Sequence, residues 1–153
     1  KMITREYNIQ AEESLPYAKL KVYLWEKSPE IQIKNRPLIL ICPGGGYEFT
    51  SDREADPLAT QFLAMGYQVA ILRYSVAPAE YPVALLEAFT AIKMIRENAD
   101  EWCVEAEKLF VLGCSAGGHL AASVGMFWNK KWIAEKLGCN HFSLLFTIQG
   151  LFI

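Results

Sequence analysis

The stretch KLFVLGCSAGGHLAAS, residues 108–123, decides the fold, because within it one kind of secondary structure gives way to another. Its first residues are mostly apolar and predict a buried strand, whereas AGGHLAAS has the small residues of a helix that packs closely on a sheet. Between them, Gly113-x-Ser115-x-Gly117 predicts a turn so tight that its flanking residues must be small. Such a turn lifts the Ser115 hydroxyl above the sheet, where the Ala116 N–H group and the helix dipole can face a developing oxyanion.

The rest of the chain alternates strands and helices around this turn. Each predicted strand is an apolar run of about six residues, and each crossover has helical length, which is typical of a mostly parallel α/β sheet covered on both faces. Apart from residues 108–113, we expect strands at 19–26, 37–42, 67–74 and 142–148, and helices at 51–66, 82–102, 116–128 and 129–138. We expect a single domain over residues 1–153.

Composition excludes several classes of protein. Hydrophobic residues make up 52% of the chain and charged residues 21%, as in a globular protein, and the net charge of −2 gives no reason to expect nucleic acid or a membrane as partner. No stretch resembles a signal peptide or a membrane span. The cysteines lack the spacing of a metal site, so we expect no metal and reduced thiols in a cytoplasmic protein; they are Cys42, Cys103, Cys114 and Cys139.

A glycine-rich loop follows the strand that precedes the serine turn by about seventy residues. In CPGGGY, residues 42–47, the N–H groups of Gly45 and Gly46 can approach a bound carbonyl oxygen closely. A phosphate-binding loop or a plain turn is the alternative, but the Walker and dinucleotide patterns are both absent. The serine turn alone has a similar alternative, namely a glycine-rich turn with an unrelated serine.

Three segments in the same order resemble the α/β-hydrolases of the acetyl-esterase and hormone-sensitive-lipase-like group, close to its small bacterial carbohydrate-esterase-like members: CPGGGY, RYSVAPAEYP and GCSAGGHLAAS. The resemblance covers roughly Leu20 to Trp128. It implies ester hydrolysis by the nucleophile Ser115 without a metal or organic cofactor, and an oxyanion hole formed by the N–H groups of Gly45, Gly46 and Ala116. Many relatives carry a histidine where this chain has Pro43, so any support that the histidine gives the loop is absent here.

The acid and the base of the expected catalytic triad are harder to find. In this family they follow the nucleophile in the order Asp or Glu, then His. After Ser115 the chain has no Asp, its only acid is Glu135, and its only histidines are His119 and His141. His119 is interpreted as a structural hydrogen-bonding residue, and Glu135 and His141 lie too close together to match the family. We therefore expect the N-terminal part of an α/β-hydrolase, truncated after the nucleophile helix.

Two functional hypotheses remain. The first is a carboxylester hydrolase for short acyl groups such as acetyl on a sugar or small alcohol, with Tyr47, Tyr74 and Tyr81 lining the pocket unless they serve only loop packing. The second is an inactive hydrolase-like fragment that acts as a structural or self-associating module. We expect self-association in either case, because a shortened sheet leaves apolar surface uncovered. Behind the site, Arg73 is expected to pair with Glu80 or Glu54, or to remain solvated.

Overall fold

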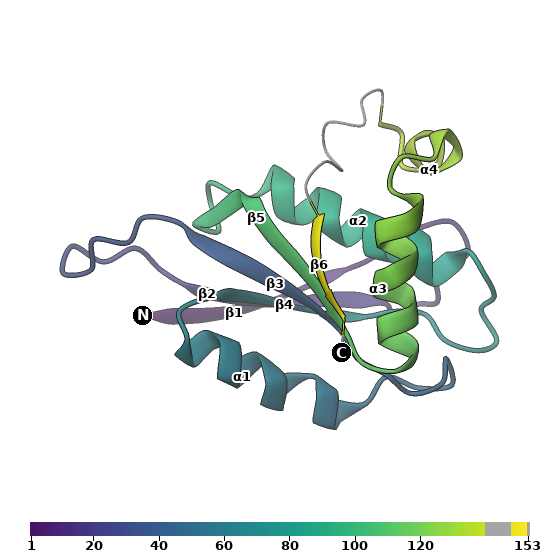
Figure 1. Ribbon diagram of the computed structural model, residues 1–153, viewed down its shortest axis with the longest axis horizontal. Coiled ribbons are helices and arrows are strands. Elements are labelled where there is room, and N and C mark those ends of the chain that lie inside the picture. The colour runs from purple at the N-terminus through teal and green to yellow at the C-terminus, as the bar shows by residue number, and fades with distance from the viewer. Residues whose placement is uncertain (140–147, 153) are drawn as a thin grey trace.

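The computed structural model describes residues 1–139 and 148–152, which form one sheet with helices on both sides (Figure 1). Within these residues the sheet has six strands in the order β1-β2-β4-β3-β5-β6. The strands are β1 (Met2–Asn8), β2 (Lys19–Trp25), β3 (Arg36–Cys42), β4 (Gln68–Arg73), β5 (Val104–Gly113) and β6 (Ile148–Phe152). Strands β4, β3, β5 and β6 are parallel to one another, whereas β2 runs antiparallel to both β1 and β4.

The three buried strands at the centre are parallel neighbours, as the sequence predicts. Leu40 of β3 lies opposite Ala70 of β4 on one side and Val111 of β5 on the other. At the end of the ladder, Cys42 pairs with Gly113. Because both strands end at this level, the glycine loop after β3 and the serine turn after β5 leave the sheet side by side.

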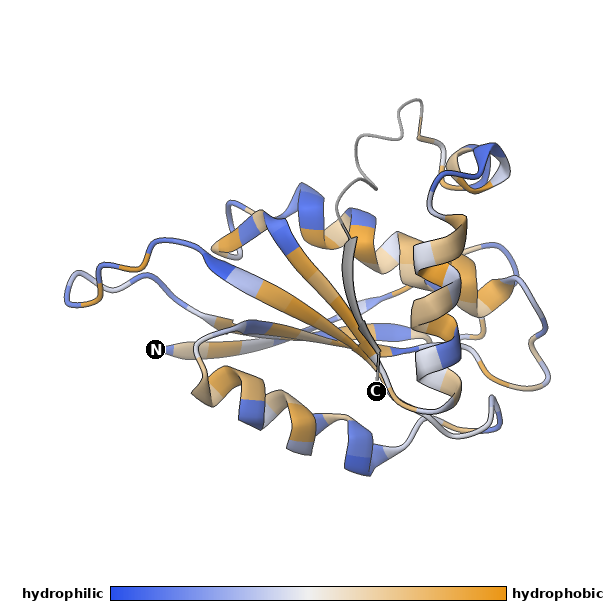
Figure 2. Ribbon diagram, viewed as in Figure 1, coloured by the Kyte–Doolittle hydropathy of each residue, from blue (hydrophilic) through white to orange (hydrophobic). Residues whose placement is uncertain are grey.

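Helices cover the two faces of the sheet separately (Figure 1). Helix α1 (Asp56–Ala64) lies on one face, and helices α2 (Val83–Glu97) and α3 (Ala116–Phe127) lie on the other. Alternate strand residues divide between the two cores: Leu40 belongs to the core under α2 and α3, and Ile41 to the core under α1. Figure 2 shows the resulting apolar strands between helices that carry both apolar and polar residues. Helices on both faces therefore confirm the expected α/β class.

Three local predictions differ from the structure. Strand β1 was not expected; most of its side chains are exposed, so it lacks an apolar run. The helix expected at 51–66 divides into a 3₁₀ turn (Asp52–Glu54) and α1, because Ala55 between them has non-helical backbone angles. In the C-terminal segment the strand is Ile148–Phe152, after a short helix α4 (Lys131–Lys136); most of the expected 142–148 strand lies outside the described residues.

None of the helices in the described part of the chain is long and apolar enough to cross a bilayer.

Candidate functional site

The turn between β5 and α3 holds Ser115 in a strained backbone conformation. Ser115 has φ 52° and ψ −118°, as predicted for this turn, and its side chain is exposed. A Cβ atom on Gly113 would lie 2.0 Å from the carbonyl oxygen of Gly117, and one on Gly117 would lie 1.9 Å from that of Cys42. Both flanking positions therefore accept only glycine, and this close packing fixes the serine at the start of the helix.

The glycine loop after β3 lies directly against this turn. A Cβ atom on Gly44 would come within 2.6 Å of the Cys114 carbonyl oxygen and 3.0 Å of the Ser115 Cβ. The next three residues have left-handed backbone angles, with φ 140° at Gly45, 65° at Gly46 and 61° at Tyr47. The structure thus confirms that Ser115 lies beside the loop formed by residues 44–47.

Three backbone donors of the glycine loop and the serine turn have no acceptor among the described residues. Among the described residues, the N–H groups of Gly45, Gly46 and Ala116 take part in none of the hydrogen bonds that the structure shows. The Ala116 group also lies at the N-terminus of α3, where the helix dipole favours negative charge. Free donors around an exposed hydroxyl can hold a developing oxyanion, although their role in this chain stays a prediction.

The loop is anchored by side chains from the surrounding segments. The carboxylate Oε2 of Glu54 accepts the Gly44 N–H group at 2.7 Å, and the Tyr74 hydroxyl donates to the Pro43 carbonyl oxygen. Tyr74 is completely buried, and burial raises the pKa of its hydroxyl. The expectation that Tyr74 lines a pocket is therefore wrong, because its side chain points into the protein and supports the loop from beneath.

Arg73 holds the segment that follows the loop. Its Nη1 donates to the Thr50 carbonyl oxygen at 2.9 Å, and its Nη2 donates to the Asp52 carboxylate at 2.9 Å. The pairing expected with Glu80 or Glu54 is therefore wrong. The Arg73 guanidinium instead holds the residues that follow the glycine loop, at Thr50 and Asp52, while Glu54 binds the start of the loop at Gly44.

An open pocket of about 230 Å³ begins one helical turn from Ser115. The Tyr47 hydroxyl and His119 Nδ1 are hydrogen-bonded at 2.8 Å, and both residues line the pocket together with the largely exposed Tyr81. Two of the three expected tyrosines are thus at this pocket. Its lining consists of Tyr47, Ser75, Ala79, Glu80, Tyr81, Pro82, Ala84, Leu85, His119, Leu120 and Ser123.

Sequence reasoning missed a buried carboxylate that shapes the pocket. Glu87 of α2 is completely buried, and its two oxygens accept hydrogen bonds from the Ser75 N–H at 2.6 Å, the Ser75 hydroxyl at 2.6 Å and the Ser14 hydroxyl at 2.8 Å. Burial raises the pKa of Glu87, and these hydrogen bonds oppose that effect. A single acid within the apolar run ALLEAF was the sequence signal for such a group.

The described residues do not supply an acid and a base at Ser115. Glu135 lies exposed on α4 and pairs with Lys131 at 3.5 Å, and His141 lies outside the described residues. The His119 Nδ1 is occupied by Tyr47, and within the described chain no histidine is hydrogen-bonded to the Ser115 hydroxyl. The same part of the chain contains no group of three or more side chains that could hold a metal ion.

Comparison with known proteins points to esterases with this fold. The BD-FAE family model matches residues 22–146. Esterase LipC from Mycobacterium tuberculosis is 31% identical over 108 residues, which are 69% of this chain and 27% of LipC. An acetyl esterase from Salmonella schwarzengrund is 27% identical over 143 residues, which are 90% of this chain and 41% of that protein.

A solved structure extends the comparison to three dimensions. MGS-M1, an alpha/beta hydrolase enzyme from a Medee basin deep-sea metagenome library, has a TM-score of 0.76 to this chain and is 39% identical. The match covers 80% of this chain and 50% of MGS-M1. The chain thus spans about half of this solved structure, and less of the two curated relatives.

Proposed function

Because the chain belongs to the BD-FAE family and has the α/β-hydrolase fold, we propose that it is a carboxylester hydrolase with Ser115 as the nucleophile. One observation carries this proposal. The exposed, strained Ser115 lies against a glycine loop in which the Gly45 and Gly46 N–H groups have no acceptor among the described residues. Strain of this kind persists only where the surrounding structure enforces it, and it is concentrated at functional sites.

The proposed reaction has two steps. The Ser115 Oγ attacks the ester carbonyl carbon while its proton passes to a general base, and the carbonyl oxygen becomes an oxyanion held by the N–H groups of Gly45, Gly46 and Ala116. Collapse of this intermediate breaks the bond to the alcohol, which leaves with the proton. Water then attacks the acyl-enzyme by the same route, releasing the acid and restoring the serine. No described residue is placed to act as the base.

We further propose short acyl esters, such as acetyl esters of sugars or small alcohols, as substrates. An acetyl esterase is among the relatives, which supports the acyl size. The pocket beside Ser115 carries the aromatic rings of Tyr47 and Tyr81 and the carboxylate of Glu80. Aromatic rings offer a flat apolar surface to one face of a sugar, and a carboxylate can accept its hydroxyl protons.

Turnover of an activated acetyl ester by the full chain and its Ser115→Ala variant tests the proposal. We expect slow hydrolysis, because no described residue supplies a base, and without one about 10³–10⁴-fold catalysis over water remains from the oxyanion hole and substrate binding. Acyl transfer to the serine releases one alcohol per chain in an initial burst, before steady turnover begins. Ser115→Ala should abolish this burst and the part of the rate that depends on it. Thr60→Ala, which removes an exposed hydroxyl on α1 outside the pocket, is the control. An unchanged burst in Ser115→Ala would overturn the assignment.

A second candidate function, a self-associating hydrolase-like module, is favoured by a specific surface. An apolar groove of about 170 Å³ lies on the α1 face of the sheet, lined by Ile39, Phe62, Tyr67, Phe110 and Leu112. Strand β6 is the last in the sheet order, and unpaired edge strands invite strand addition. Light scattering after size-exclusion chromatography over a range of concentrations tests this candidate, and a monodisperse monomer would refute it.

A further inference from the structure

The first peptide unit of the glycine loop is held by a carboxylate. Glu54, in the 3₁₀ turn ten residues further along the chain, accepts the Gly44 N–H group at 2.7 Å. Hydrogen bonds to an ionised acceptor are roughly twice as strong as neutral ones. Pro43, the preceding residue, has neither an N–H group nor a polar side chain with which to orient this peptide. The hydrogen bond that Gly44 donates to Glu54, together with the one that the Pro43 carbonyl oxygen accepts from Tyr74, therefore fixes the peptide at which the loop begins.

The carbonyl groups that follow are turned toward the same segment. The Gly44 carbonyl oxygen accepts the Ser51 N–H at 2.8 Å, and the Gly45 carbonyl oxygen accepts N–H groups from Glu48 at 3.0 Å and Phe49 at 3.2 Å. In a planar trans peptide the C=O and N–H bonds point in opposite directions. The N–H groups of Gly45 and Gly46, which belong to these peptide units, therefore point away from the 48–54 segment.

Of the other side-chain anchors, Tyr74 holds the same Pro43–Gly44 peptide unit from its carbonyl side, whereas Arg73 does not reach the glycines. Tyr74 binds the Pro43 carbonyl oxygen, and Arg73 binds Thr50 and Asp52. Among the described residues, Glu54 is the one whose side chain is hydrogen-bonded to a glycine of the loop. Its negative charge also lies close to Cys114, whose pKa is raised first by burial and then by Glu54. A free carboxylate so near Ser115 would oppose an oxyanion, and its bond to Gly44 reduces that opposition.

We infer that Glu54 is a positioning residue whose carboxylate, through Gly44, turns the Gly45 and Gly46 N–H groups toward the Ser115 hydroxyl. This inference rests on the proposed function for its catalytic meaning. Its structural content, the orientation of the loop peptides by one side chain, can be measured without any turnover.

Amide hydrogen exchange and ¹H–¹⁵N spectra of the full chain provide the first measurement. In Glu54→Ala the Gly44 amide should exchange at least about tenfold faster, since a hydrogen bond to a charged group is lost, and the Gly45 and Gly46 signals should shift. Glu54→Gln retains an accepting oxygen and should restore protection to within about threefold. Arg53→Ala, in the same 3₁₀ turn, is the control. Unchanged signals for all three glycines in Glu54→Ala would overturn the inference.

Glu54→Asp tests whether the loop requires the position of the carboxylate or only its negative charge. It also replaces Glu54→Ala if that variant does not fold. The aspartate keeps the negative charge but is one methylene shorter, so it should lose Gly44 protection as alanine does. Protection retained in Glu54→Asp and lost in Glu54→Gln would mean that charge, rather than position, is what the loop requires, and the inference would fail.

Covalent capture of Ser115 by a fluorophosphonate provides the second measurement, because its phosphoryl oxygen uses the same N–H donors as the oxyanion. Capture should be about tenfold slower in Glu54→Ala and near the wild-type rate in Glu54→Gln. Equal rates in wild type and Glu54→Ala, with altered glycine signals, would overturn the positioning role. Capture of the wild type no faster than of Ser115→Ala would instead overturn the proposed nucleophile, and the amide measurement would still decide the orientation of the loop.

Discussion

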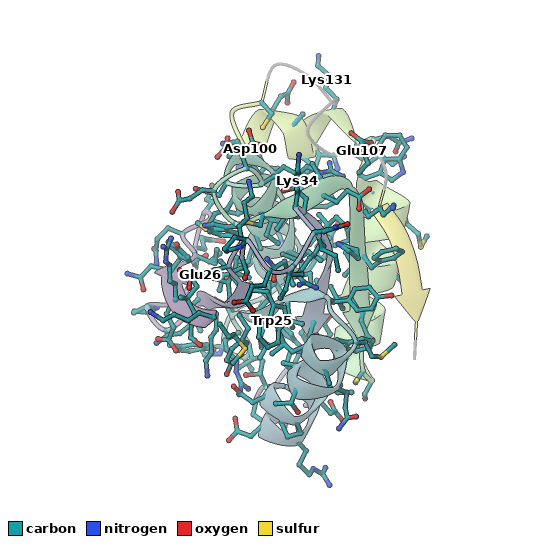
Figure 3. All side chains as sticks on the ribbon, turned by 90° about the vertical axis from the view of Figure 1, so that its left-hand side faces the viewer. Trp25, Glu26, Lys34, Asp100, Glu107 and Lys131 are labelled. Carbon is teal, nitrogen blue, oxygen red and sulfur yellow. The ribbon has the colours of Figure 1, made fainter. Side chains whose placement is uncertain are left out.

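The two ends of the parallel strands differ in how their backbone polar groups are satisfied. At the carboxyl end, Tyr47 and Ser115 have positive φ angles, and the Gly45, Gly46 and Ala116 N–H groups have no acceptor among the described residues. At the amino end, which faces the viewer in Figure 3, the fully buried Gln68 accepts the Trp25 N–H at 2.7 Å. Its amide nitrogen donates to the carbonyl oxygens of Trp25 at 3.0 Å and Trp102 at 2.8 Å.

Left-handed backbone occurs at both ends, since Cys103, directly before β5, has φ 54°; the two ends differ in whether their polar groups are paired. Among the described residues, Trp102 Nε1 at the amino end is the one buried side-chain nitrogen or oxygen without a hydrogen-bond partner. Unpaired donors and left-handed backbone at the carboxyl end are unfavourable for folding and useful for binding a carbonyl oxygen. Substitutions at the two ends should therefore differ in the sign and the size of their effects.

The largest effect is expected at the closest backbone contact of the carboxyl end. Gly117→Ala should lower the free energy of unfolding by about 4 kcal/mol, because the new Cβ would meet the carbonyl oxygens of Cys42 at 1.9 Å and Pro43 at 2.6 Å. Urea unfolding measures this change. Gly138→Ala is the control: its added Cβ meets nothing within 4 Å, and its φ of 64° should cost about 1 kcal/mol. Equal losses in the two variants would show that crowding is not the cause.

The second largest loss of stability is expected at Glu87, the buried carboxylate behind the pocket. Glu87→Ala leaves the buried Ser75 N–H without an acceptor and should cost about 3 kcal/mol. Burial raises the pKa of Glu87 in the folded state, so its contribution to stability is fully present below its ordinary value of 4.5 and is lost as pH rises through the folded value.

Urea unfolding of wild type and Glu87→Gln between pH 4 and pH 7 checks this sign. The glutamine does not titrate, so wild type should lose stability relative to Glu87→Gln as the pH rises. A stability difference that stays constant across this range would contradict the raised pKa.

At the amino end, Gln68→Leu should cost about 2 kcal/mol, because it leaves the Trp25 N–H and the Trp102 carbonyl oxygen without their partner. The exposed Gln61→Leu on α1 is the matched control and should change stability little. Capture of Ser115 by the fluorophosphonate should stay the same in Gln68→Leu. A change in capture would mean that the two ends of the sheet are coupled, and the comparison would fail.

The strain at Ser115 predicts an effect of opposite sign. Ser115→Gly should stabilise the chain by about 1 kcal/mol, since glycine adopts φ 52° without steric cost, although its greater freedom in the unfolded chain offsets part of the gain. Ser115→Ala keeps the strain and should leave the thermal midpoint nearly unchanged. If alanine raised the midpoint as much as glycine does, loss of the hydroxyl rather than relief of strain would be responsible.

The smallest effect is expected at the surface of the carboxyl end. Asp52 pairs with Arg73, but its carboxyl group is 96% exposed, so Asp52→Ala should cost no more than about 0.5 kcal/mol. Repeating the measurement in 1 M NaCl should abolish even this difference, because salt screens exposed pairs. A loss above about 1 kcal/mol that survives high salt would show that the loop depends on this contact.

The central strands and the serine turn could be predicted because their signals are local. Residues 37–42 form an unbroken apolar run, and the glycines at 113 and 117 mark a turn that no larger residue fits. Strand β1 could not be predicted, since an exposed edge strand pairs through its backbone and needs no apolar pattern.

Side-chain roles at the site were harder to predict, because they depend on the direction in which each residue leaves its element. Tyr74 and Tyr81 both flank the same loop in sequence, yet Tyr74 points into the core and Tyr81 points outward. The contact of Glu54 with Gly44 joins a 3₁₀ turn to a strand end, and neither residue carries a pattern that indicates its partner. Such contacts follow from the tertiary fold rather than from local sequence.

The pairing of Cys42 with Gly113 has a consequence for how the chain folds. The glycine loop and the serine turn meet only when strands about seventy residues apart have docked, and closing so long a loop precedes any gain from the contact. During synthesis the glycine loop leaves the ribosome well before β5 has been made. Until then the loop has no serine turn to pack against. We therefore expect the geometry proposed for ester cleavage to form late in folding, after the parallel core has been ordered.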